Sequence, residues 1–227
     1  PGGTGLLWYE PDELVAVVRE CDGAGFQVAV HAQGERGIRT TLAAFERVVE
    51  PGNPRRHRIE HGGCFTSDLR RTAARLGIHV ASQPAFLSAL GDGYLEAFGT
   101  ARAGRLYPFG SLLREGVLVA GSSDAPVVGA SPLVAMRDAQ LRRTDDGHVL
   151  GANEALSASE ALELYTRNAA FVSGAEDRLG SLELGKLADF VVLDRNPLTS
   201  DAEALTEAVV RMTVVGGEVA FERAAAG

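Results

Sequence analysis

The regular alternation of short apolar segments with helical patterns over residues 1–150 constrains the fold more than any other feature of this sequence. Four runs have the length and composition of buried strands: residues 26–31, 57–61, 78–82 and 117–122. Apolar residues at helical spacing lie beside these runs, at residues 11–22, 38–50, 67–76, 106–115 and 132–143. Strands that alternate with helices pair in parallel through crossover connections, and uniformly apolar strands are covered on both faces. The sequence therefore predicts an α/β fold around a parallel sheet.

One glycine-rich stretch interrupts the alternation. Residues 86–104 contain Gly91, Gly93, Gly99 and Gly104. Clustered glycines between periodic segments are typical of loops, and long loops in compact domains are often lids or binding loops. We therefore expect a long loop here, in the position of a lid.

Beyond residue 150 the pattern changes in character. Residues 159–174 have the spacing of an amphipathic helix, and residues 209–222 have that of a β-hairpin with Gly216–Gly217 as its two-residue turn. The last part of the chain is thus rich in β-structure, whereas the first part is α/β. We expect two domains, over residues 1–175 and residues 176–227.

Charge and composition exclude several classes of partner. The net charge is -8 and the sequence pI is about 5.2, so the chain repels phosphate backbones and we expect no nucleic-acid partner. No run approaches the roughly 18 apolar residues of a membrane span, so we expect no membrane partner. Cys21 and Cys64 are too few for a disulfide scaffold and favour a reducing, cytoplasmic setting.

Three ligand-type residues follow predicted strands. His31, His61 and Asp124 each stand where a strand ends, and functional sites of parallel α/β folds gather at the carboxyl ends of strands. Imidazole nitrogens and a carboxylate are suitable ligands for a zinc-like divalent ion. Alternation along the strands places His31 and His61 on a common inner face, and it places Glu60 on the opposite face. The sequence predicts a metal site, although a single histidine or aspartate at a strand end is commonly structural.

Asp124 has a second predicted role. A carboxylate beside a metal ion can accept a proton from water and return it to the leaving group, so Asp124 is our candidate general base. The alternative for Asp124 is a turn or helix-capping aspartate. Glu60 fits an ion pair with Arg58, and Glu35 fits a surface ion pair or a contact that supports a ligand.

The substrate is expected to be a small molecule. Gln83, Phe86 and Tyr94 lie in or just before the predicted loop, and we assign them to substrate binding. Aromatic residues at this spacing fit the packing of a lid equally well, so both roles stay open. The identity of the substrate does not follow from these residues.

Six segments in a fixed order carry a family resemblance. They are VAVHAQGERG, RHRIEHGG, VASQPAF, GVLVAGSSDAPV, SASEALELYTRNAA and GSLELGKLADFVVLD. With these segments, over most of residues 26–222, the chain resembles the metal-dependent amidohydrolase superfamily. Within it, the chain is most similar to amidohydrolase family 3, which includes N-substituted formamide deformylase-like enzymes.

The resemblance implies a fold, a cofactor and a reaction. The fold is a (β/α)8 TIM-like barrel with a small β-sandwich built from both chain ends. His31, His61 and Asp124 correspond to the ends of barrel strands five, six and eight, where they would hold one or two divalent ions, above all zinc. The implied activity is hydrolysis of a carbon–nitrogen bond other than a peptide bond.

The sequence also departs from that family pattern. The first-strand His-x-His pair does not occur, and neither does the strand-four Lys or Glu ligand. Residues 1–150 are fewer than the about 250 residues of a complete barrel, so we expect only its C-terminal half, strands five to eight. An exposed sheet edge invites pairing, so we expect self-association or pairing with the missing N-terminal half. Metal binding by this chain alone would be weak or absent, and the alternative to a hydrolase is a non-catalytic scaffold or regulatory domain.

Overall fold

The protein folds around a four-stranded parallel sheet. The computed structural model describes residues 5–224. Within them the strands lie side by side in chain order: β1 (Ala29–Ala32), β2 (Arg58–His61), β3 (His79–Ser82) and β4 (Val119–Gly121). The predicted parallel α/β arrangement is confirmed, and each strand is shorter than the apolar run that predicted it.

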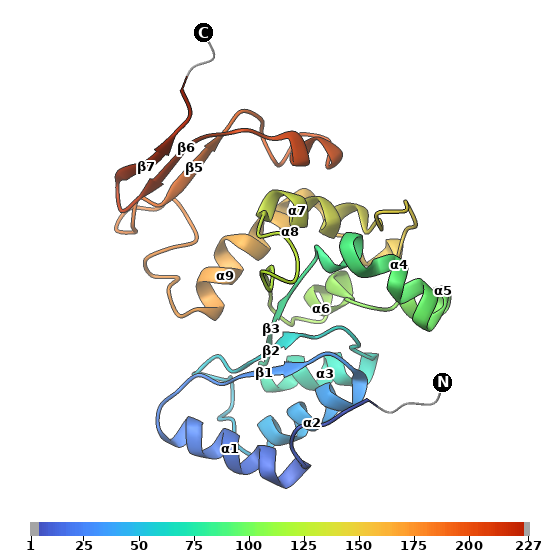
Figure 1. Cartoon of the computed structure of the whole chain (residues 1–227). Helices are drawn as coiled ribbons and strands as arrows, with labels where there is room; N and C mark the ends of the chain where they lie inside the picture. The colour runs from blue at the N-terminus through green and yellow to red at the C-terminus, as the bar shows by residue number, and fades with distance from the viewer. Residues whose placement is uncertain (1–4, 225–227) are drawn as a thin grey trace.

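One face of this sheet packs against helices. Val30, Ile59, Val80 and Val119 are in register across the four strands, so their side chains project from the same face. The last three are fully buried, and burial of each such side chain stabilises the fold by roughly 1.5–3 kcal/mol. Figure 1 shows the first three helices gathered on one side of β1 and β2. The predicted helices of this α/β part are observed as α1 (Pro11–Gly23), α2 (Glu35–Glu46), α3 (Ser67–Leu76), α6 (Phe109–Arg114) and α7 (Pro132–Leu141).

The opposite face of the sheet is polar and open at β1. Ala29, Arg58 and His79 are in register there, and His31 and Glu60 lie two residues nearer the carboxyl end. Ala29 and His31 are exposed. Among the described strands, β1 pairs with β2 alone. This face therefore presents His31 at an accessible strand end.

Residues 86–104 are largely helical, so the predicted lid loop is wrong. The segment forms α4 (Phe86–Phe98) and α5 (Thr100–Ala103), which are separated at Gly99, where φ is 72°. Gly91 lies within α4, and a Cβ at this position would lie 2.5 Å from Cγ2 of Thr144. The glycine thus permits close packing of the helix on Thr144. Glycine content alone does not distinguish such packing from a loop.

The predicted helix over residues 159–174 is divided in two. The first part, α8 (Ala158–Tyr165), begins with a capping box between Ser157 and Glu160. The second part, α9 (Arg167–Val172), follows directly. Thr166 separates them because its backbone, with φ of -122° and ψ of -96°, is not helical.

A second, antiparallel sheet forms near the end of the chain (Figure 1). Its strands, in spatial order, are β5 (Phe190–Leu193), β6 (Val210–Val215) and β7 (Glu218–Glu222). Gly216 and Gly217 have φ of 60° and 84°, which confirms the predicted hairpin turn. Two 3-10 helices are described: η1 (Ala152–Glu154) lies between α7 and α8, and η2 (Glu203–Glu207) lies between β5 and β6.

Cys21 and Cys64 are free thiols. Among residues 5–224, no helix combines the length and hydropathy required to cross a bilayer.

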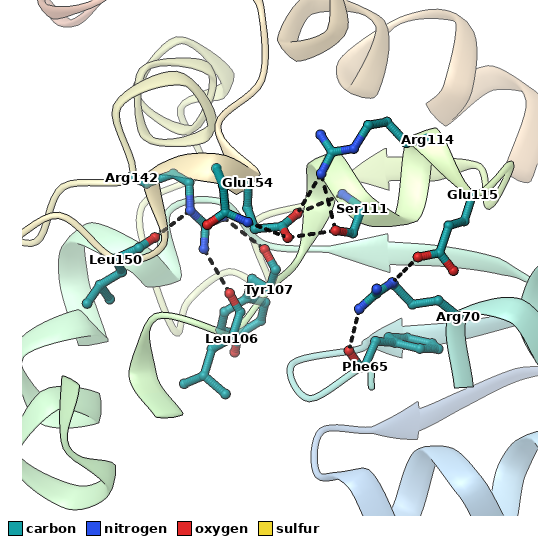
Figure 2. Close-up of polar contacts among 11 residues, drawn as sticks. Phe65, Arg70, Leu106, Tyr107, Ser111, Arg114, Glu115, Arg142, Leu150 and Glu154 are labelled. Carbon is teal, nitrogen blue, oxygen red and sulfur yellow. Dashed lines mark hydrogen bonds and ion pairs between the residues drawn. The ribbon is translucent and has the colours of Figure 1, made fainter. Parts of the chain in front are cut away.

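Two buried charged side chains tie the segments after β3 together (Figure 2). Arg142, at the end of α7, is fully buried and donates to the carbonyl oxygens of Leu106, Tyr107 and Leu150. Desolvation lowers the pKa of Arg142 to about 10, so the group stays charged at neutral pH. Glu154 accepts hydrogen bonds from the backbone N–H and the hydroxyl of Ser111, both at 2.7 Å. These bonds satisfy a free N–H in the first turn of α6.

Candidate functional site

Two of the predicted ligands meet at the carboxyl ends of neighbouring strands. His31 is in β1 and His61 is the last residue of β2. Their ring centroids are 4.5 Å apart, and the ring planes are inclined by 71°. At this separation the two imidazoles can direct nitrogens toward a common ion. The structure thus brings together the pair that the sequence placed at one site.

The strand register and backbone conformation that bring the two rings together differ from those expected. In the sheet register His31 is opposite Glu60, and His61 is opposite Ala32. Cross-strand partners project from the same face, so Glu60 shares the face of His31, and the prediction that it lies on the opposite face is wrong. His61 has a φ of 71°, which ends the extended conformation and reorients this residue at the strand end. Simple alternation does not apply at such a turn.

Glu60 contributes charge to this site. Its carboxylate accepts a hydrogen bond of 2.6 Å from Nε of Arg58, as predicted. Desolvation lowers the pKa of His31, and His61 adds to this effect, whereas Asp124 and Glu60 oppose it. The net lowering favours neutral imidazole, which is the form of histidine that binds metals.

Asp124 does not form a metal-ligating cluster with the histidine pair. It is exposed on the turn that follows β4, and its φ is 55°. Its carboxylate acts on His31 electrostatically. Within residues 5–224, however, no group of three or more His, Cys, Asp or Glu side chains is placed to hold a metal ion. The structure therefore unites two of the three predicted ligands.

Two of the three residues predicted to bind substrate contact His61. Nδ1 of His61 lies 2.9 Å from Oε1 of Gln83. The ring of Phe86 stacks on that of His61 with an angle of 15° between planes and 6.3 Å between centroids. Gln83 and Phe86 are 1% and 3% exposed, whereas Tyr94 is half-buried. The hydroxyl of Tyr94 lies 3.1 Å from that of Tyr107.

Tyr107 is a site-forming residue that the sequence analysis did not identify. It is 2% exposed, and its hydroxyl oxygen accepts a hydrogen bond of 3.0 Å from Nε2 of Gln33, which follows β1. Its backbone N–H donates to the carbonyl oxygen of Gly63, which follows β2. Burial raises the pKa of Tyr107, so the phenol stays protonated. Tyr107 connects the loops after β1 and β2, and no local pattern signals such long-range bonds.

Two further polar residues have structural partners. His57 is buried just before β2, at the opposite end of that strand from His61. Its Nδ1 accepts from the backbone N–H of Val28, and its Nε2 lies 3.0 Å from Oδ1 of Asp22. Glu35 pairs with Arg39 on the exposed surface of α2, which agrees with the surface ion pair considered for it.

Comparison with known proteins gives the family context. The sequence model of the amidohydrolase family matches residues 4–221. The chain is 33% identical over 225 residues to an N-substituted formamide deformylase of Arthrobacter pascens. This alignment covers 96% of this chain and 41% of that protein. The chain spans about two fifths of the length of the curated relatives that it matches.

Two solved structures have a similar fold. One is an uncharacterized metal-dependent hydrolase from Pyrococcus horikoshii OT3, with a TM-score of 0.78 and 31% identity over 89% of this chain and 41% of that one. The other is an uncharacterized metal-dependent hydrolase from Pyrococcus furiosus, with a TM-score of 0.74 and 32% identity over 88% of this chain and 40% of that one. Both belong to the class of protein that the sequence motifs indicate.

Proposed function

The chain belongs to the amidohydrolase family, and from this premise we propose that it supplies part of the active centre of a metal-dependent hydrolase. The proposed reaction is cleavage of a non-peptide carbon–nitrogen bond in a small, amide-like molecule. The observation that carries the proposal is the 4.5 Å approach of the His31 and His61 rings at adjacent strand ends. Parallel α/β folds use this edge of the sheet for catalysis.

The donor chemistry of the pair suits a divalent ion, and zinc is our candidate. His31 and His61 would be ligands, and Asp124 would be a further ligand or a proton acceptor near them. Bound zinc would act as a Lewis acid toward the carbonyl group of the substrate. The hydrogen bond at Nδ1 of His61 leaves Nε2 of the same ring available.

Asp124 is the proposed general base. An exposed carboxylate with electrostatic influence on His31 has access to water and to a proton-transfer partner. Of the three residues assigned to substrate binding, Tyr94 remains our candidate because it is half-buried. Gln83 and Phe86 are almost fully buried and both contact His61.

We further propose that the free edge of β1 pairs with another strand. Ala29 and His31 are exposed there, and within the described part of the chain β1 has one neighbour. The His-x-His pair and the Lys or Glu ligand that the family resemblance implies do not occur in the sequence. A second copy of the chain, or a companion segment that carries those ligands, would cover this edge and complete the half barrel of strands five to eight.

A non-catalytic scaffold is the second candidate function. It is favoured by the position of Asp124, which leaves the described residues without a three-ligand cluster. Zinc binding distinguishes the two candidates, because a scaffold does not require side chains placed to bind a metal.

The test is calorimetric titration of the chain with zinc chloride. We expect binding that becomes at least about tenfold weaker in His31→Ala and in His61→Ala, because each substitution removes a ligand. His148→Ala is the matched control, since His148 is exposed and lies after α7, outside the strand ends that carry the pair. Because the chain alone is expected to bind zinc weakly at most, equal binding by all variants would reject the hydrolase proposal, and no binding at all would favour the scaffold. Hydrolysis of an N-substituted formamide by the zinc-loaded chain would support it further.

A further inference from the structure

Two consecutive residues at the end of β3 hold both the backbone and the side chain of His61. The hydroxyl of Ser82 donates to the carbonyl oxygen of His61 at 2.6 Å. Oε1 of Gln83 lies 2.9 Å from Nδ1 of the same histidine. Ser82 and Gln83 are each 1% exposed, and His61 is 8% exposed. Water therefore has little access to these bonds.

We propose that Ser82 and Gln83 form a positioning clamp that fixes His61 with its proton on Nδ1 and a free lone pair on Nε2. The clamp rests on the proposed role of His61 as a metal ligand. It assigns Gln83 to the support of that ligand, in place of direct contact with substrate. An amide oxygen accepts hydrogen bonds only, so the nitrogen that faces it must carry the proton.

A third residue holds the Gln83 amide in this orientation. Nε2 of Gln83 donates to the hydroxyl oxygen of Ser122 at 3.1 Å. The backbone N–H of Ser122 donates in turn to the carbonyl oxygen of Ser82 at 2.8 Å. Both ends of the amide are thus occupied. Rotation of the amide by 180° would place NH2 against Nδ1 of His61 and would move the proton of the imidazole to Nε2.

Packing restricts the His61 ring in the remaining directions. Phe86 stacks on it with an angle of 15° between planes, and His31 approaches it edge-on. The bond from Ser82 fixes the carbonyl of His61 at the point where φ is 71°. Ring and backbone are therefore held by separate contacts, as expected for a ligand that must be oriented before an ion binds.

The clamp also links His61 to the segment that carries Asp124. Ser122 precedes Asp124 by two residues on the exit from β4. The chain of bonds from His61 through Gln83 to Ser122 therefore spans the ends of β2, β3 and β4. Substitution of Gln83 is expected to change the orientation of the His61 ring most. A smaller change in the turn that carries Asp124 is expected through Ser122.

The tautomer of His61 can be read directly by long-range 1H–15N NMR on the zinc-free chain with 15N-labelled histidine. The sequence has five histidines, and the signals of His61 are identified by their loss in His61→Gln. At about pH 8.5, above the ordinary pKa of histidine, we expect the Nδ1–H tautomer. Gln83→Glu keeps an acceptor and should keep this tautomer. Gln83→Met has a similar length without an acceptor and should give a mixture or the Nε2–H form.

Ser122→Ala provides a second, milder variant, because it frees the Gln83 amide to rotate while both clamp residues remain. We expect it to shift His61 toward a tautomer mixture. Wild-type protein with the proton on Nε2, or a Gln83→Met spectrum like that of wild type, would overturn the clamp.

Zinc titration of the same variants separates this inference from the proposed function. Gln83→Met should weaken zinc binding by about 10- to 100-fold, and Gln83→Glu should weaken it less. If the chain binds no zinc but His61 has the predicted tautomer, the proposed function fails and the clamp stands. If zinc binds equally well to wild type and to Gln83→Met, the clamp fails and the metal site stands.

Discussion

His31 and Glu60 are opposite one another in the register of β1 and β2, so imidazole and carboxylate occupy the same face of the sheet. The carboxylate raises the pKa of His31 and thereby opposes the lowering by desolvation and by His61. Glu60 is also bonded to Nε of Arg58. Glu60 directly precedes His61 on β2, but its carboxylate acts on His31 of the neighbouring strand β1.

Glu60→Gln should therefore lower the pKa of His31 further in the metal-free chain. The substitution removes a negative charge and leaves Arg58 without its carboxylate partner, and both changes disfavour imidazolium. Proton NMR titration of the histidine ring signals measures the shift. Glu35→Gln is the control, because Glu35 pairs with Arg39 on an exposed helix surface. An increase in the pKa of His31, or an equal shift in both variants, would contradict the relationship.

The candidate ligands could be recognised from the sequence, but the geometry of His61 could not. Residue type and position at a strand end are sufficient to select His31 and His61. Alternation then failed at His61 because it assumes extended backbone, and φ at this residue is 71°. The contacts of Gln83 with His61 and Ser122 join residues 22 and 39 positions apart, and such bonds leave no periodic pattern.

Gly91→Ala and Gly93→Ala should have opposite effects on stability, although the two glycines lie two residues apart in α4. A Cβ at Gly91 would lie 2.5 Å from Cγ2 of Thr144 and 3.1 Å from Cδ1 of Leu150, and such overpacking costs about 1–3 kcal/mol. A Cβ at Gly93 meets nothing within 4 Å, and alanine in a helix is favoured over glycine by about 1 kcal/mol. Urea unfolding of both variants measures the difference. Equal effects would indicate a loop in place of α4.

The fold could be predicted where local patterns and tertiary packing agree. The four apolar runs form strands that pair in parallel and pack one face against helices, although the other face is open at β1. Gly216–Gly217 is a turn because both residues adopt positive φ. The loop predicted over residues 86–104 is wrong because these glycines are compatible with helix, and Gly91 permits a close contact with Thr144. Whether a glycine permits a turn or a close approach depends on a partner that is distant in sequence.

Glu154→Gln should destabilise the protein through the first turn of α6 (Figure 2). The carboxylate is 6% exposed and accepts two hydrogen bonds of 2.7 Å from Ser111. A neutral amide provides one acceptor oxygen in place of two and no charge, so at least one charge-assisted hydrogen bond from Ser111 is lost, at a cost of about 1–3 kcal/mol. Glu203→Gln is the control, because Glu203 pairs with Arg143 at the surface and is expected to contribute less than about 1 kcal/mol. Similar free energies of unfolding for the two variants would show that the Glu154 contacts do not stabilise α6.

His79 should make the protein less stable in acid. Desolvation and, to a lesser degree, Arg56 lower the pKa of His79 to about 4 in the folded state, against an ordinary value of about 6.5. Between these two values the unfolded chain binds the proton more readily, so stability falls as the pH falls from about 6.5 to about 4. The loss is bounded at about 3 kcal/mol, from 1.36 kcal/mol per pKa unit.

His79→Gln should remove this part of the acid dependence of unfolding, measured by urea titration at several pH values. His148→Gln, at an exposed position, should retain it. If the stability of His79→Gln falls with pH as steeply as that of wild type, the acid sensitivity originates at other groups.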